Sequence, residues 1–140
     1  MFEVTVKYEK TLENGLTKKA SEKYIMNGSV TFGEAEKSIT KEMQAYISGD
    51  FEVSAVKKAF YQEIIKSNAL TADKWYKVKI NLLNIDEKTG NLKKQAASYL
   101  VQAATVGEAK ENFVNSAKAW TVDYEIESIS DTKIMDVYGN

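Results

Sequence analysis

The chain has 140 residues, of which 44% are hydrophobic and 28% are charged, and its formal net charge is −1. This composition is typical of a globular protein rather than a disordered or membrane-spanning one. The chain has no Cys and no His, and all 19 of its basic residues are Lys, which excludes disulfides, thiolate nucleophiles, His general bases and bidentate Arg contacts.

The first predicted element is a half-buried strand, because residues 2–8 alternate apolar and polar side chains. The pair Asn14–Gly15 follows, and Asn-Gly supplies the positive φ angles that a tight hairpin turn needs. A return strand is expected over residues 17–27. The chain therefore begins with a predicted β-hairpin.

A helix is predicted next, because Thr31 and Glu34 have the spacing of a capping box. In this motif Thr accepts a hydrogen bond from the backbone N–H of Glu, and Glu reaches back to the N–H of Thr. An apolar stripe suited to pack on a sheet follows at helical spacing: Ala35, Ile39, Met43, Tyr46 and Ile47. We expect a third strand at residues 51–55, its continuation after a kink at 59–65, and a connector at 67–73.

The second half of the chain repeats this order of elements. Thr31-Phe32-Gly33-Glu34-Ala35 returns as Thr105-Val106-Gly107-Glu108-Ala109, and Tyr24-Ile25-Met26 returns as Tyr99-Leu100-Val101. The expected elements are a strand at 76–82, a turn at 86–90, a return strand at 92–103, a helix whose stripe ends at Trp120, and strands at 124–128 and 134–138.

We interpret this pattern as a tandem duplication of a ββαβ unit, with repeat 1 at about residues 1–66 and repeat 2 at about residues 75–138. One such unit has a single helix and little core of its own. The sequence therefore predicts an α+β fold and a single domain over residues 1–140. We expect the two units to have pseudo-two-fold symmetry, to share one core, and to pack two helices on one side of an antiparallel sheet.

The carboxylates form no recognisable catalytic or metal-binding pattern. Glu34 and Glu108 are explained by the helix caps. The acidic residues near the end of the chain lack the glycine-anchored spacing of a calcium loop: Asp123, Glu125, Asp131 and Asp136. A glycine-rich phosphate loop is also missing from the sequence. We therefore expect a protein that is not an enzyme and that has no metal and no cofactor.

The second hairpin carries the most informative group of residues. Residues 74–102 contain six Lys and two carboxylates, a net charge of +4 in a chain of −1. Aromatic rings between lysines on an open sheet are typical of proteins that bind single-stranded nucleic acids, where bases stack on rings and ammonium groups contact phosphates. The candidate nucleic-acid-binding residues are Trp75 and Tyr99 for stacking, with Lys77, Lys79, Lys93 and Lys94 for phosphates. The alternative is an ordinary solvent-facing strand surface, where Lys, Tyr and Trp are common.

Four motifs follow one another in the second half: Tyr76-Lys-Val-Lys79, Ile85-Asp-Glu-Lys-Thr-Gly90, Tyr99-Leu-Val-Gln-Ala103 and Thr132-Lys-Ile-Met-Asp-Val137. With these motifs, and over nearly its whole length, the chain resembles a family of short proteins from Bacteroidetes and from the phages that infect them, classified as a domain of unknown function. The resemblance carries over no functional residue. It implies a phage-type setting, in which handling DNA and countering host defence are expected roles.

The sequence thus predicts a non-enzymatic phage-type binding protein of the cytoplasm, with single-stranded DNA as its leading partner in replication or recombination. We expect no membrane association, because there is no signal-peptide pattern before the first strand and no apolar run long enough to span a bilayer. The alternative is a homo-oligomer that sequesters a small nucleotide signal or a host protein, since duplicated sheets with open edges assemble readily.

Overall fold

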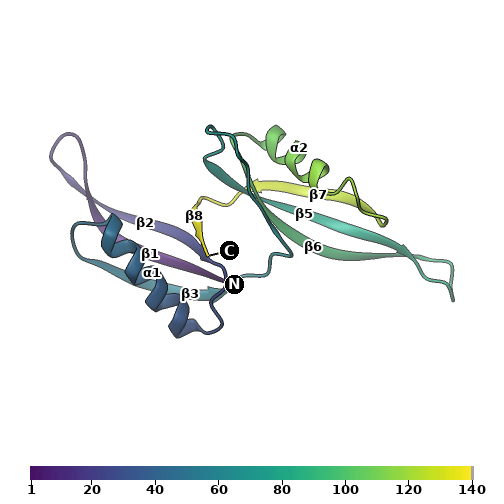
Figure 1. Ribbon diagram of the computed structural model, residues 1–140, viewed down its shortest axis with the longest axis horizontal. Coiled ribbons are helices and arrows are strands. Elements are labelled where there is room, and N and C mark those ends of the chain that lie inside the picture. The colour runs from purple at the N-terminus through teal and green to yellow at the C-terminus, as the bar shows by residue number, and fades with distance from the viewer. Residues whose placement is uncertain (140) are drawn as a thin grey trace. The chain divides into compact units, whose positions relative to one another are not determined.

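The computed structural model describes residues 1–139 and has eight strands and two helices (Figure 1). The predicted α+β class is confirmed. The chain divides into two compact units. Unit 1 consists of residues 1–59 together with the segment from Ile134 onward, and unit 2 consists of residues 60–133. The units do not coincide with the two sequence repeats, because the chain leaves unit 1 after residue 59 and returns to it at Ile134.

Unit 1 is a four-stranded sheet in the order β3-β1-β2-β8, with helix α1 on one face (Figure 1). Its elements are β1 (Phe2–Thr11), β2 (Thr17–Met26), α1 (Phe32–Tyr46), β3 (Phe51–Lys58) and β8 (Ile134–Tyr138). Strand β1 is antiparallel to β2 and β3, whereas β8 runs parallel to β2. The core joins the helix stripe to one alternating face of the strands: Phe2, Val4, Val6, Tyr24, Met26, Ala35, Ile39 and Met43.

Unit 2 has the same arrangement, with strand order β4-β6-β5-β7 and helix α2 on one face. Its elements are β4 (Ile64–Ile65), β5 (Lys74–Ile85), β6 (Leu92–Ala103), α2 (Val106–Ser116) and β7 (Asp123–Asp131). The ring of Phe113 is fully buried at the centre of its core. Trp120, expected on the helix stripe, lies beyond the end of α2 and still packs edge-on against Phe113 at 5.7 Å.

Both helices begin at the predicted caps. The Thr31 hydroxyl accepts a hydrogen bond from the Glu34 N–H at 3.1 Å, and the Thr105 hydroxyl accepts one from the Glu108 N–H at 3.2 Å. The Glu34 carboxylate, however, accepts from the N–H of Val30 at 2.8 Å rather than from that of Thr31. The helix starts were therefore predictable from the sequence, while the second bond of the capping box differs by one residue.

The two units share irregularities as well as element order. A β-bulge interrupts the β1–β3 ladder between Thr5 and Val6, and another interrupts the β5–β7 ladder between Lys79 and Ile80. These pairs occupy the same positions in the two repeats. A bulge is a local feature that families keep, so its presence in both units supports the duplication. Pseudo-two-fold symmetry between the units stays a prediction.

The expectation that both helices pack on one sheet is wrong, because each helix packs on a separate four-stranded sheet. Most of the buried side chains form two clusters, one inside each unit. Each helix packs its buried stripe on the sheet of its own unit. The sheets are also mixed rather than purely antiparallel, because β4 and β8 pair in parallel.

The fourth strand of each sheet comes from the other sequence repeat. Strand β4 ends repeat 1 but pairs with β6, where Ile64 lies opposite Leu100. Strand β8 ends repeat 2 but pairs with β2, where Val137 lies opposite Ile25. The prediction that residues 59–65 continue the third strand of the first half is therefore wrong. Such a short strand has no periodicity of its own, and an available sheet edge decides where it pairs.

Candidate functional site

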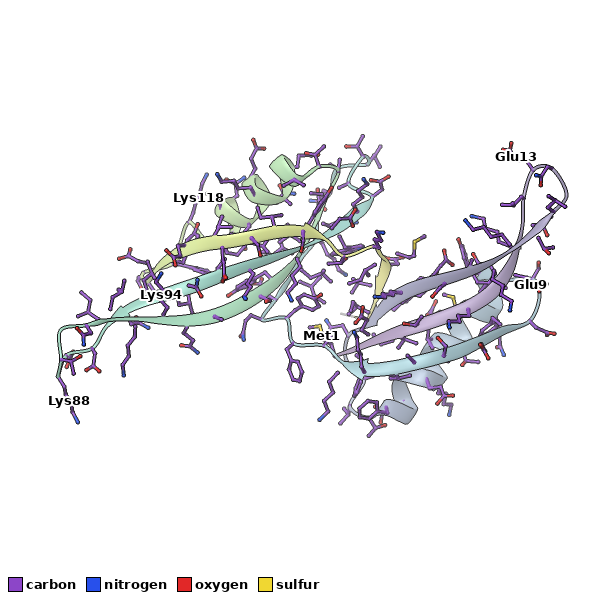
Figure 2. All side chains as sticks on the ribbon, turned by 180° about the vertical axis from the view of Figure 1, so that it is seen from behind. Met1, Glu9, Glu13, Lys88, Lys94 and Lys118 are labelled. Atoms are coloured by element: carbon purple, nitrogen blue, oxygen red, sulfur yellow. The ribbon has the colours of Figure 1, made fainter. Side chains whose placement is uncertain are left out.

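The second hairpin forms the middle of the sheet in unit 2. Strands β5 and β6 pair without interruption from Lys74 opposite Ala103 to Ile85 opposite Leu92, and β7 pairs along the other side of β5. Successive side chains of a strand point to opposite faces. One face packs on α2, and we call the other the open face. Figure 2 shows Lys94 on this hairpin and Lys88 at its tip.

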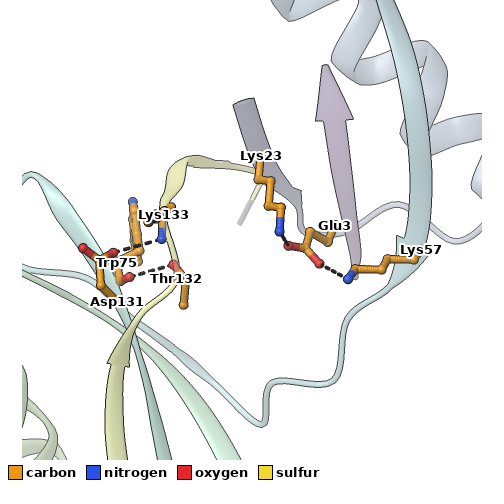
Figure 3. A network of polar contacts seen from close by, with 7 residues as sticks. All are labelled: Glu3, Lys23, Lys57, Trp75, Asp131, Thr132 and Lys133. Atoms are coloured by element: carbon orange, nitrogen blue, oxygen red, sulfur yellow. Dashed lines mark hydrogen bonds and ion pairs between the residues drawn. The ribbon is translucent and has the colours of Figure 1, made fainter. Parts of the chain in front are cut away.

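Trp75 and Tyr99, the two expected stacking residues, are both buried. Tyr99 lies opposite Val78, so it belongs to the helix face, where its ring centroid is 5.2 Å from that of Phe113. Trp75 is 3% exposed, and its carbonyl oxygen accepts hydrogen bonds from the N–H and the hydroxyl of Thr132 at 3.1 and 2.7 Å (Figure 3). The expected exposure of the two rings is therefore wrong. Tyr99 packs in the core under α2, and Trp75 is buried although strand alternation places it on the open face.

Two of the candidate lysines form ion pairs across the open face. The Lys94 Nζ lies 2.9 Å from Glu125, and the Lys79 Nζ lies 3.6 Å from Glu127. Asn81 donates to both carboxylates, at 3.3 and 3.4 Å. The hydrogen bond with Lys94 lowers the pKa of Glu125, and the same bond raises the pKa of Lys94. A phosphate group would have to compete with these carboxylates for the ammonium groups.

The other two candidate lysines differ from each other. Lys93 lies 3.2 Å from Asp86, whose pKa is lowered first by the backbone N–H of Lys88 and then by Lys93. Lys77 is exposed and has no ion pair within the described part of the chain. The structure therefore keeps three of the four candidate lysines beside carboxylates and leaves one without such a partner.

The charge of the hairpin is balanced by its neighbouring strand. Strand β7 pairs with β5 and places four carboxylates beside the hairpin, whose residues 74–102 have a net charge of +4. They are Asp123, Glu125, Glu127 and Asp131. These acidic residues and the lysines lie far apart in the chain, so only the pairing of β5 with β7 brings them together. The positive field that the hairpin alone predicts is largely neutralised in the sheet.

The outer edge of β6 is the feature of unit 2 that sequence reasoning missed. At one end of this edge β4 is bound, through a bond from the Gln62 N–H to the Ser98 carbonyl at 2.8 Å and one from the Leu100 N–H to the Glu63 carbonyl at 3.2 Å. Toward the turn, over residues 92–97, no strand of the described chain pairs on this side. The edge is thus occupied at one end and open at the other.

Backbone alternation identifies the open hydrogen-bonding groups. Ser98 and Leu100 direct their N–H and C=O groups toward β4, and a residue two positions along a strand points its backbone groups the same way. Lys94 and Ala96 therefore direct theirs toward the unoccupied edge. These two residues present a short row of donors and acceptors to an incoming strand.

The lysines near this edge are held away from it. Lysine side chains commonly protect sheet edges from pairing. Here Lys94 reaches Glu125 on β7, on the far side of β5, and Lys93 reaches Asp86 at the turn. Gln95, Ala96 and Ala97 follow, and they carry no charge. The open part of the edge is therefore bordered by small or neutral side chains.

A hollow of about 380 Å³ lies in the same unit, lined by Leu82, Tyr99, Ala119, Trp120, Thr121 and Val122. Most of its lining is apolar. Leu82 lies opposite Gln95 of β6, and both therefore belong to the helix face. One lining residue of the hollow is therefore paired with a residue in the unoccupied part of the β6 edge.

Within residues 1–139 no group of three or more Asp or Glu is placed to hold a metal ion. No helix in that range is both long enough and apolar enough to cross a bilayer. The hydrogen-bonding row on β6 remains the best-defined feature with which the chain could engage a partner.

A comparison with known families gives one match. The family model described as "Domain of unknown function (DUF4494)" matches residues 1–140. No curated protein and no solved structure matches the chain. The match extends across both units.

Proposed function

The chain belongs to the family described as Domain of unknown function (DUF4494), and from the geometry of unit 2 we propose that it is a protein-binding module that pairs an extended segment of a partner with the open edge of β6. The observation that carries the proposal is the half-occupied edge. Strand β4 already binds there by backbone pairing. Strand addition to an exposed sheet edge is a recurring mode of peptide recognition.

The chemistry of the two faces indicates what the partner strand carries. Alternate side chains of an added strand point to opposite faces of the sheet. On the helix face they meet the apolar hollow beside Leu82 and Trp120. On the open face they meet the ion-paired side chains of Lys94 and Glu125. A partner segment with alternating apolar and polar residues fits both surfaces.

This proposal corresponds to one of the alternatives that the sequence leaves open, the binding of a host protein. In the phage-type setting that the family resemblance implies, the partner segment belongs to a protein of the infected cell. The Bacteroidetes and phage origin stays a prediction. The role of the β6 edge does not depend on that origin.

The test uses peptides selected from a displayed random library on the immobilised full chain. Ala96→Pro removes the outward N–H, and its ring occupies the edge, while the bonds of β6 to β5 come from other residues. The matched control is Ala96→Thr, which keeps the N–H at the same exposed position. We expect the selected peptides to bind the wild-type chain and Ala96→Thr alike. Ala96→Pro should weaken binding by at least about tenfold, the effect of roughly one lost hydrogen bond together with a steric block.

Hydrogen exchange provides the second measurement. A bound strand should slow amide exchange at Lys94 and Ala96, because their N–H groups acquire partners. Thermal melting of both variants checks that they fold. Selection that yields no binder, or binders that tolerate Ala96→Pro without loss, would end the proposal.

Single-stranded DNA binding is the second candidate, and the exposed, unpaired Lys77 is the observation that favours it. The buried rings of Trp75 and Tyr99 weigh against it. If lysine–phosphate contacts hold the strand, affinity for an oligothymidylate must fall steeply with salt. Lys77→Gln should then reduce both the affinity and its salt dependence, whereas Lys118→Gln on the far side of the unit should not. Absence of binding at low salt would exclude this function.

A further inference from the structure

Strand β8 completes the sheet of unit 1 although the residues before it belong to unit 2. The strand pairs in parallel with β2, where Val137 lies opposite Ile25 and Tyr138 lies opposite Met26. Ile25 is fully buried and Val137 is 8% exposed. The edge of β2 is therefore a strand-binding site whose occupant is supplied from a distant part of the chain.

The fit of β8 to this site depends on specific side-chain and backbone contacts. The Tyr138 ring stacks on that of Tyr24 with centroids 5.7 Å apart. The Tyr138 carbonyl accepts a hydrogen bond from the Asn27 N–H at 2.8 Å. These contacts involve only residues 134–138 and the β2 region. They would be the same if β8 came from another molecule.

Unit 2 has an equivalent site, and there a different segment fills it. Ile64 of β4 lies opposite Leu100, and Leu100 holds the position in repeat 2 that Ile25 holds in repeat 1. Both Leu100 and Ile25 are fully buried. In each sheet, then, the fourth strand is contributed by the other repeat, and the docking position is equivalent.

The connection that leads into β8 is short and strained. Lys133 has φ +59°, and within the described residues it is the only residue other than glycine with positive φ. Its N–H donates to the Asp131 carboxylate at 2.9 Å (Figure 3). A lysine in the left-handed region has an energetic cost that an extended connection would not have. Short, strained hinge loops favour the exchange of the following element between molecules.

We propose that β8 exchanges between two copies of this chain, so that the β2 edge of one copy binds β8 of the other. The partner at this surface is a second copy of the same protein. In the exchanged dimer Lys133 adopts an extended conformation, and every contact of β8 with β2 is kept. The driving force is the relief of backbone strain at the hinge, and the opposing factor is the loss of translational freedom on association.

Because the chain contains no cysteine, engineered disulfides can report this exchange directly. Full chains carrying Ile25→Cys and full chains carrying Val137→Cys are mixed, incubated at high concentration and oxidised. Paired residues on adjacent strands are close enough for a disulfide. A heterodimer with a 25–137 bond is expected, identified by mass spectrometry of the digested product. The control mixes Ile25→Cys with Glu3→Cys, which are also opposite each other in the sheet, but β1 is held between two strands.

Exchange predicts several-fold more disulfide heterodimer from the Ile25→Cys and Val137→Cys mixture than from the control mixture. Equal yields from the two mixtures would overturn the proposal. Cooperative melting of each variant establishes that it folds. If either buried-site variant fails to fold, Lys23→Cys with Ile134→Cys replaces the pair, since these residues also lie opposite each other.

Hinge variants test the cause of the exchange. Lys133→Gly removes the penalty of positive φ, so it should lower the heterodimer yield by about fivefold or more. Lys133→Val increases that penalty, because β-branched residues disfavour positive φ, and it should raise the yield. A yield that is the same for all three residues at position 133 would show that hinge strain does not drive β8 exchange.

Discussion

Glu22 lies on the helix face of unit 1 beside two tyrosine hydroxyls. The Tyr24 hydroxyl donates to its carboxylate at 3.2 Å. Burial, followed by the hydrogen bond and the negative charge of Glu22, raises the pKa of Tyr8 to about 12. Burial and the same carboxylate also raise the pKa of Tyr24 well above its ordinary value. Both hydroxyls therefore stay protonated and continue to donate in solutions where an exposed tyrosine would ionise.

These shifts predict how stability depends on alkaline pH. The folded-state pKa values lie above the ordinary value of 10.0, so the folded chain holds these protons more tightly than the unfolded chain. The associated stability is present below pH 10 and decreases as the pH rises from 10 toward about 12. Urea unfolding at a series of pH values should show this decrease, together with delayed tyrosinate absorbance in the folded protein.

The variant Tyr8→Phe has no phenolic proton at that position, so its stability should fall less over the same pH range. Tyr61→Phe serves as the comparison, because no pKa shift of Tyr8 or Tyr24 depends on Tyr61. If wild type and Tyr8→Phe lose stability in parallel above pH 10, the hydroxyl of Tyr8 is not coupled to folding.

At the scale of single elements, the end of β8 requires a glycine. Gly139 has φ +88°, and a Cβ atom there would overlap the carbonyl oxygen of Asn27. The strand end would have to move away from β2 to make room. Gly33 in the first turn of α1 has an ordinary φ, and the nearest atom to a Cβ there is 3.9 Å away.

The substitutions Gly139→Ala and Gly33→Ala should therefore have clearly different effects on stability. Gly139→Ala is expected to destabilise unit 1 by more than about 1 kcal/mol, through backbone strain and the clash at Asn27. Gly33→Ala should be neutral or stabilising by up to about 1 kcal/mol, because Ala favours the helix. Chemical denaturation measures both. Similar effects from the two substitutions would contradict the placement of β8 against Asn27.

Local sequence patterns predicted most helices, strands and turns. They did not predict which distant segments pair with each other. The caps at Thr31 and Thr105 and the hairpins were recognisable because each depends on a few neighbouring residues. The face of Tyr99 depends on strand register, which alternation in one strand does not define. The neutralisation of Lys94 by Glu125 and the docking of β4 depend on contacts between segments far apart in the chain.

At the scale of the whole molecule, the two separate cores predict separable stability. Phe113 is fully buried in unit 2, and Ile39 is fully buried in unit 1. Phe113→Ala should cost about 3–5 kcal/mol, and Ile39→Ala about 2–5 kcal/mol. Each loss should appear mainly in the unit that contains the substitution, because the side chains around each cavity belong to that unit.

Amide hydrogen exchange can distinguish the units. Phe113→Ala should accelerate exchange of the slowest amides in residues 60–133 and leave those of residues 1–59 nearly unchanged. Ile39→Ala should have the reverse effect. Uniform acceleration across both units by either variant would show that they unfold as one cooperative block.

The route of the chain through the two units also has a consequence for biosynthesis. The ribosome completes every residue of unit 2 before it adds β8 to the nascent polypeptide. The sheet of unit 1 is synthesised first, but it lacks β8 until residues 60–133 of unit 2 have been translated. Domains generally fold in the order in which they are synthesised. Here unit 2 can be completed before unit 1, although unit 1 is started first. Until then the β2 edge of the growing polypeptide lacks its strand and is open to chaperones and to neighbouring chains on the same polysome.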